Sequence, residues 1–144
     1  MRIILGLILV GLLSWVTIIM AHPVDRDYND LTLGEYTWLE KKIVIEAVTT
    51  YEGWYEESRS YRNNNPGNIR GGSYATWRGA IGVDKDGFAI FETVKDGEAA
   101  LEHLLFESKT YPTLNLKDAI FRYAPTNENH SQAYYEFVLK RLVA

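Results

Sequence analysis

The 144-residue sequence contains no cysteine, four prolines and three scattered histidines. The absence of cysteine excludes a disulfide framework and thiolate-bound metals. His22, His103 and His130 are too far apart in the sequence to show zinc-ligand spacing. We therefore expect neither a metal nor a cofactor.

Basic runs are also lacking. The chain carries 15 Lys and Arg against 19 Asp and Glu, for a net charge of −4. Proteins that bind nucleic acid concentrate positive charge on one face or in one segment. Nucleic acid is therefore a poor candidate partner.

Residues 1–20 have a composition of their own. After Arg2, the run 3–20 contains no charge, and its only polar side chains are Ser14 and Thr17. A run of eighteen residues lies near the lower limit for spanning a bilayer, and the residues before His22 form a poor cleavage site. We predict an uncleaved membrane anchor, with a cleaved signal sequence as the alternative. Either places the rest of the chain in the periplasm, at the cell exterior or on a viral membrane, and an exported domain without cysteine fits bacteria or their viruses.

The remaining chain is predicted to be a polar tether over 21–31 and one domain over 32–144. A capping box of Thr32 and Glu35 starts an apolar stripe that reaches Tyr51, which predicts a helix. A glycine- and asparagine-rich loop over 53–72 and a small antiparallel hairpin over 74–91 follow. Further helices are expected over 93–108, 115–123 and 131–142. This order predicts an α+β fold, a helical bundle with a small hairpin region and a substrate cleft between the two parts.

One carboxylate stands out at the end of the first helix, in the segment IEAVTTYEGWY. Glu52 lies at the negative pole of the helix dipole and next to aromatic residues, and both conditions raise the pKa of a carboxyl group. A carboxylic acid that stays protonated near neutral pH is what glycosidic bond cleavage requires, because the leaving oxygen must receive a proton. A simpler interpretation is also open, in which Gly53 ends the helix and Glu52 is merely solvated.

Several segments together resemble the phage and bacterial branch of the lysozyme superfamily. These are TYEGWY, RNNNPGNIR, GFAIF followed by a helix, and FRYAPTNEN with AYYEFV, covering about residues 36–142. Their order is similar to that of soluble lytic transglycosylases and goose-type lysozymes, and the first part also resembles peptidoglycan glucosaminidases. The resemblance implies a lysozyme-like fold that cleaves the glycan strands of peptidoglycan, and chitin-like substrates stay open.

The resemblance also implies roles for individual residues. Glu52 matches the general acid, Gly97 matches a glycine through which a helix packs behind the site, and Tyr123 would face the acid. The remaining matches would line the cleft floor and its far wall: Asn65, Pro66, Gly67, Asn68, Asn127, Glu128 and Asn129. Pro fixes φ and Gly permits φ > 0, which would make the floor a rigid turn. Turns that close on their own backbone explain Asn63 and Asn64 equally well.

A second acid is not evident. Asp84 and Asp86 are the acidic residues of the expected hairpin and are candidates for a base that activates water, although a turn ending in Asp-Gly is the favoured interpretation. Without such a base, Glu52 would take both proton-transfer roles, as in a lytic transglycosylase. Arg62 and Arg70 flank the asparagine loop and are candidates for contacts with peptide-stem carboxylates, with internal salt bridges favoured.

From the sequence, we therefore expect a membrane-tethered enzyme that cuts peptidoglycan glycan strands, as a lytic transglycosylase or a muramidase of endolysin type. The competing hypothesis is a non-catalytic wall-binding or structural protein of a virion or envelope. The presence of Glu52 among aromatic residues argues against it.

Overall fold

The computed structural model describes residues 26–125 and 130–144. The predicted anchor over 1–20, the first part of the tether, and Asn127, Glu128 and Asn129 lie outside these residues. No helix within the described ranges is long and apolar enough to cross a membrane.

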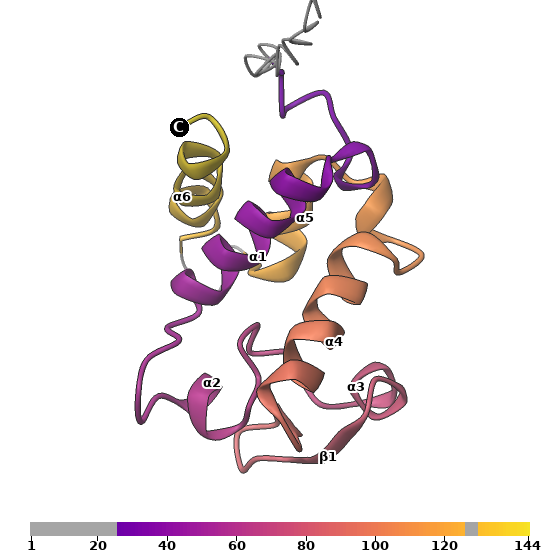
Figure 1. Cartoon of the computed structure of the whole chain (residues 1–144), viewed down its shortest axis with the longest axis vertical. Helices are drawn as coiled ribbons and strands as arrows, with labels where there is room; N and C mark the ends of the chain where they lie inside the picture. The colour runs from indigo at the N-terminus through magenta and orange to yellow at the C-terminus, as the bar shows by residue number, and fades with distance from the viewer. Residues whose placement is uncertain (1–25, 126–129) are drawn as a thin grey trace, which may run out of the picture.

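The described residues form a mostly helical α+β fold in two parts (Figure 1). In one part, α6 (Ser131–Leu142) packs against both α1 (Trp38–Tyr51) and α5 (Leu116–Tyr123). The other part contains α2 (Arg59–Arg62), α3 (Ser73–Trp77) and a hairpin of β1 (Ala80–Val83) and β2 (Ala89–Phe91). Helix α4 (Val94–Phe106) runs from the hairpin towards α1 and contacts β2, α1 and two short 3-10 helices, Leu33–Glu35 and Tyr111–Thr113. The predicted α+β class, mostly helical with one antiparallel hairpin, is confirmed among the described residues.

The first long helix begins later than the sequence predicted. The capping box of Thr32 and Glu35 is present, but it caps the 3-10 helix over 33–35. A second capping box, made by Thr37 and Glu40, starts α1 at Trp38. Tyr36 separates the two helices in an extended conformation (φ −70°, ψ 139°), and its side chain is buried. The apolar stripe therefore crosses a break that its periodicity does not reveal.

Residues 26–31 of the expected tether pack against the domain. Tyr28 is 7% exposed, lies edge-on to the ring of Tyr36, and donates a hydrogen bond to Glu40 Oε1 (3.0 Å). The same carboxylate oxygen lies 3.2 Å from Arg26 Nε. The packed structure thus extends to Arg26, ahead of the boundary expected at residue 32.

The hairpin is shorter than predicted. Its two strands pair antiparallel, from Ala80 opposite Phe91 to Val83 opposite Ala89. The register shifts between Ala80 and Gly82. Residues 74–77, expected as the first part of the hairpin, belong to helix α3 (Ser73–Trp77). Tyr74 anchors this helix by donating a hydrogen bond to Ala100 O on α4 (2.8 Å). That tertiary contact explains why an aromatic, β-prone segment is helical here.

The core joins the two parts. Its largest fully buried side chains come from α1, the hairpin, α4, α5 and α6, and they include Val48, Phe91, Leu101, Leu116 and Tyr134. Side chains of both parts therefore pack in one core, which holds the end of α1 opposite the asparagine loop.

Candidate active site

The end of α1 places Glu52 through a glycine-dependent stop. Glu52 caps the helix, and Gly53 follows in the left-handed region with φ 79°. The amide of Gly53 donates to Thr50 O (3.1 Å), and that of Trp54 donates to Thr49 O (3.2 Å). These are the two hydrogen bonds of a Schellman motif. The predicted helix stop is confirmed, and it leaves the Glu52 side chain half-buried at the helix end.

Two side chains from distant segments donate hydrogen bonds to the Glu52 carboxylate. Tyr134 OH, on α6, lies 3.1 Å from Oε1, and Asn68 Nδ2 lies 3.3 Å from Oε2. Asn68 Nδ2 also donates to the backbone carbonyl of Glu52 (3.1 Å). The ring of Tyr51 stacks on the ring of Tyr134, with 3.8 Å between the two centroids, and holds it in place. The carboxylate is therefore oriented from two sides.

The asparagine loop is rigid, but its left-handed residues are not where the sequence placed them. Asn64 and Asn68 have positive φ (50° and 46°), whereas Gly67 does not. Gly67 is required for close approach instead, since a Cβ there would lie 2.7 Å from Tyr123 OH and 2.8 Å from Leu101 Cδ1. Tyr123 OH donates a hydrogen bond to the Gly67 carbonyl. The expectation that Gly67 supplies φ > 0 was therefore wrong, and asparagine supplies it.

Asn65 supports the loop from within and does not line the site. Its side chain is fully buried. Its amide donates to Ile69 O and Ala89 O (both 2.9 Å), and its oxygen accepts from Ile69 N (2.9 Å). Both amide hydrogens and the oxygen of the side chain are thus used inside the protein, two bonds to Ile69 within the loop and one to Ala89 on β2. The structure gives the predicted sugar-binding residue Asn65 an internal role, and of the predicted floor residues Asn68 reaches Glu52.

Glycine at position 97 lets the loop dock on α4, as the resemblance implied. A Cβ at Gly97 would lie 2.0 Å from Asn64 O and 2.9 Å from Pro66 Cδ. Asn64 Nδ2 in turn donates to the carbonyls of Phe91 (3.1 Å) and Glu92 (3.0 Å). The loop is therefore held between α4 and the end of β2.

Glu52 opens into a cavity of about 360 Å3 between the two parts of the fold. This volume lies within the range of small-ligand sites. The lining residues are Tyr51, Glu52, Arg59, Asn68, Arg70, Phe88, Tyr123, Ala124 and Tyr134. The structure thus brings together three of the predicted site residues, namely Glu52, Asn68 and Tyr123.

Tyr123 and Tyr134, two of the three tyrosines that line the cavity, are held in their neutral form. Burial, followed by the nearby Glu52 charge, raises the pKa of Tyr123 well above its ordinary value. The same two causes raise the pKa of Tyr134, and its hydrogen bond to Glu52 adds to them. Both hydroxyls are therefore proton donors in hydrogen bonds across the physiological pH range. Tyr134 lies in the helix expected over 131–142, where one tyrosine among several apolar neighbours gave no signal of this role.

Two arginines and a phenylalanine form the opposite side of the cavity. The guanidinium carbons of Arg59 and Arg70 lie 3.6 and 4.2 Å from the centroid of the Phe88 ring. Arg59 Nε also donates a long hydrogen bond to Asn68 Oδ1 (3.5 Å). Of the two arginines predicted to flank the loop, Arg70 lines the cavity and Arg62 does not; it donates to the Glu57 carbonyl. Arg59 was missed because nothing in its local sequence distinguishes it from Arg62.

The two candidate second acids lie outside the cavity lining. Asp84 accepts hydrogen bonds from the amides of Asp86 and Phe88 (both 2.9 Å) and from Asn63 Nδ2 (2.8 Å). These bonds, the one from the Phe88 amide first, lower the pKa of Asp84. Asp86 Oδ2 lies 3.9 Å from Arg59 Nη1. The favoured turn interpretation therefore describes the position of Asp84, and the Asp86 carboxylate lies at a long distance from Arg59 without lining the cavity.

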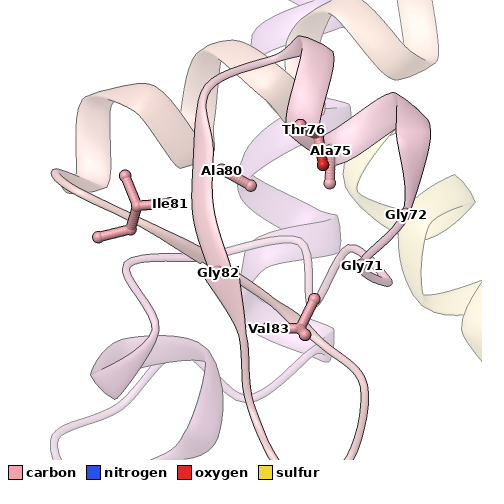
Figure 2. Close-up of a pocket in the computed structure, with 8 residues that line it drawn as sticks. All are labelled: Gly71, Gly72, Ala75, Thr76, Ala80, Ile81, Gly82 and Val83. Atoms are coloured by element: carbon pink, nitrogen blue, oxygen red, sulfur yellow. The ribbon is translucent and has the colours of Figure 1, made fainter.

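Figure 2 shows a second hollow, of about 280 Å3, between α3 and β1. Its lining residues are Gly71, Gly72, Ala75, Thr76, Ala80, Ile81, Gly82 and Val83. None of these side chains titrates, and the one hydroxyl is that of Thr76. Because general acid-base chemistry needs a titrating group, the cavity at Glu52 is the candidate active site.

The fold and cavity thus define an α+β protein that presents one oriented glutamate between a helical part and a hairpin part. The chain is similar to Protein P5 of Pseudoalteromonas phage PM2, with 36% identity over 90 residues. The match covers 60% of this chain and 56% of the phage protein, so the chain matches little more than half the length of that relative. This similarity is a distant homology to a bacteriophage protein. No protein-family model matches the chain, and no solved structure matches it.

Proposed function

We propose that this protein cleaves the glycan strands of bacterial peptidoglycan, with Glu52 as the general acid. The observation that carries the proposal is the position of Glu52: a half-buried carboxylate at a helix end, oriented by Tyr134 and Asn68, in a cavity of ligand size. The resemblance of the loop and helix segments to lysozyme-like enzymes adds to it. The similarity to a phage protein supports a viral setting.

The geometry favours a mechanism with a single acid. Glu52 in its protonated form would donate its proton to the leaving glycosidic oxygen. The carboxylate that remains would keep the hydrogen bonds from Tyr134 and Asn68, and both donors are already in place before the reaction. Preorganised donors of this kind stabilise charge that develops during the reaction.

The second step distinguishes a lytic transglycosylase from a hydrolytic muramidase. Glu52 is the one carboxylate among the described residues that line the cavity. Asp84, one of the two candidates for a second acid, is committed to the hairpin turn, and Asp86 does not line the cavity. We therefore favour deprotonation of the sugar's 6-hydroxyl by Glu52, which closes an anhydro ring and needs no activated water. Hydrolysis by water is the alternative.

Attachment to a membrane through residues 3–20 is the second part of the proposal, and it stays a prediction. It would keep the domain within reach of the wall, in the periplasm, at the cell exterior or on a viral membrane. A signal sequence that is cleaved after export is the alternative.

The decisive variant is Glu52→Gln. The amide is nearly isosteric and cannot deliver a proton, so wall cleavage on a zymogram should fall by at least two to three orders of magnitude, as for the loss of a general acid. Thermal unfolding should change little. Glu46→Gln is the matched control, because Glu46 lies on the same helix and is exposed. Loss of only a few-fold in Glu52→Gln would remove Glu52 from its role.

The products identify the reaction. Mass spectrometry of digested peptidoglycan should show anhydro-muramic ends for a lytic transglycosylase, reducing muramic ends for a muramidase and reducing glucosamine ends for a glucosaminidase. Binding of intact walls by the wild-type chain without any cleavage would favour the wall-binding or structural alternative.

A further inference from the structure

The Arg59–Phe88–Arg70 cluster gives the cavity a charge opposite to that of the whole chain. The chain has a net charge of −4, but the described residues lining the cavity include two guanidinium groups and one carboxylate. Arg59 comes from the short helix α2, and Arg70 comes from the end of the asparagine loop. Two like charges held against one ring repel each other, so the arrangement itself costs free energy.

The cluster is also held by contacts with the Phe88 ring and with Asp86. Each guanidinium gains a cation–π contact with Phe88. Asp86 lies at a long 3.9 Å from Arg59, and its backbone carbonyl accepts a hydrogen bond from Arg70 (3.2 Å). An anion in the cavity would find two guanidinium groups among its lining residues. The planar donor groups of arginine match a carboxylate in two-point hydrogen bonds.

The cluster is connected to the acid by one side chain. Asn68 accepts from Arg59 Nε through Oδ1 and donates to Glu52 Oε2 through Nδ2. A ligand group held by the arginines would therefore lie next to the glycosidic bond presented to Glu52. Arg62 is on the same short helix as Arg59, but it is exposed and does not line the cavity. Of these two arginines, Arg59 is therefore the one placed to meet a ligand.

We propose that Arg59 and Arg70, stacked on Phe88, form a carboxylate-binding subsite that selects glycans with an acidic muramyl arm over neutral glycans such as chitin. The inference rests on the proposed function, because it assigns a substrate feature to the same cavity. The carboxylate is either the lactyl group of a strand stripped of its peptides or a carboxylate of the stem peptide. Both present the same chemistry to the guanidinium groups.

Binding rather than cleavage tests the subsite. Isothermal titration calorimetry on the full-length Glu52→Gln chain would compare three ligands. The acidic ligand is the peptide-free tetrasaccharide of alternating glucosamine and muramic acid. The two neutral ligands are the same sugar with its lactyl carboxyls converted into methylamides, and chitotetraose. We expect the acidic sugar to bind about ten to a hundred times more tightly than either neutral ligand, as for a charge-assisted hydrogen-bonded pair. The preference should shrink with added salt. A stem-bearing tetrasaccharide with amidated lactyl positions distinguishes the two sources of the carboxylate.

Variants assign the preference to the cluster. On the Glu52→Gln background, Arg59→Gln and Arg70→Gln should each remove most of the preference, because they weaken binding of the acidic sugar much more than binding of chitotetraose. Arg62→Gln is the matched control and should keep the preference. Arg59→Lys keeps the charge without the planar group and should retain an intermediate preference.

Three results would overturn the subsite. They are equal binding of acidic and neutral sugars, an equal loss for both classes in Arg59→Gln and Arg70→Gln, and a loss of preference in Arg62→Gln. An equal loss for both classes would show that the arginines only position Asn68 and Glu52. A clear preference for the acidic sugar in a chain whose wild type cleaves no wall would support the subsite while refuting the proposed enzymatic function.

Discussion

Substitution of Gly97 by alanine tests whether the asparagine loop depends on close approach to α4. An added Cβ would lie 2.0 Å from Asn64 O, a backbone atom that must move about 1 Å to reach even 3.0 Å. The second contact, 2.9 Å from Pro66 Cδ, involves a rigid ring. Neither neighbour is the end of a flexible side chain, so the strain cannot be relieved by a rotamer change.

The expected cost follows from two opposing effects. Overpacking of this kind costs about 3 kcal/mol, at the upper end of its usual range. Alanine has the higher helix propensity, which stabilises α4 by at most about 1 kcal/mol relative to glycine. Gly97→Ala should therefore lower the free energy of unfolding by about 2 kcal/mol, or the melting temperature by about 6–12 °C for a domain of this size.

Thermal unfolding followed by circular dichroism measures this change, and a zymogram measures its consequence. Because Asn64 and Asn68 belong to one rigid loop, a shift at Asn64 should also displace the hydrogen bond from Asn68 to Glu52 and reduce wall cleavage. Gly82→Ala is the control, since a Cβ there meets nothing within 4 Å. A Gly97→Ala protein as stable as the Gly82→Ala protein would refute the close-packing argument.

Two further predictions concern single hydrogen-bonded groups. Tyr134→Phe removes the donor to Glu52 Oε1 but keeps the stacked ring, so we expect about a tenfold loss of wall cleavage with a melting temperature within a few degrees of wild type; unchanged cleavage would show that this donor is not used. Burial raises the pKa of Glu40, but its hydrogen bonds from Thr37 and Tyr28 and the Arg26 charge together hold it below its ordinary value of 4.5. The stabilising effect of the ionised form is therefore complete above about pH 4.5 and is lost as the pH falls through the lowered pKa. Melting temperatures between pH 3 and 7 should converge for wild type and Glu40→Gln at the acid end, and a constant difference would contradict this.

The capped helices were predictable because their signals are local. Thr93 with Asp96 and Asn115 with Asp118 start α4 and α5 at the residues expected from the sequence. Each cap depends on a side chain that satisfies an amide only three residues away. The break at Tyr36 and the helix α3 were missed for the opposite reason. The conformation at Tyr36 accompanies burial against Tyr28, and α3 is anchored by the contact of Tyr74 with α4.

Within the candidate site, the sequence by itself determined the helix end. Val48, Tyr51 and Gly53 specify an apolar stripe and a left-handed stop, and these place Glu52 at the helix terminus whatever the rest of the chain does. The same local reasoning identified the asparagine loop as a turn. It could not say which asparagine faces outward, because that depends on which one the neighbouring strand buries.

Only the tertiary structure decided what surrounds Glu52. Burial of Asn65 against β2 turns Asn68 towards the acid, and the packing of α6 on α1 brings Tyr134 to it. Arg59, on α2, stacks on the ring of Phe88, which immediately precedes β2. These contacts join residues far apart in the sequence, and no local propensity encodes them; burial of the shared core selects the one arrangement in which all of them form.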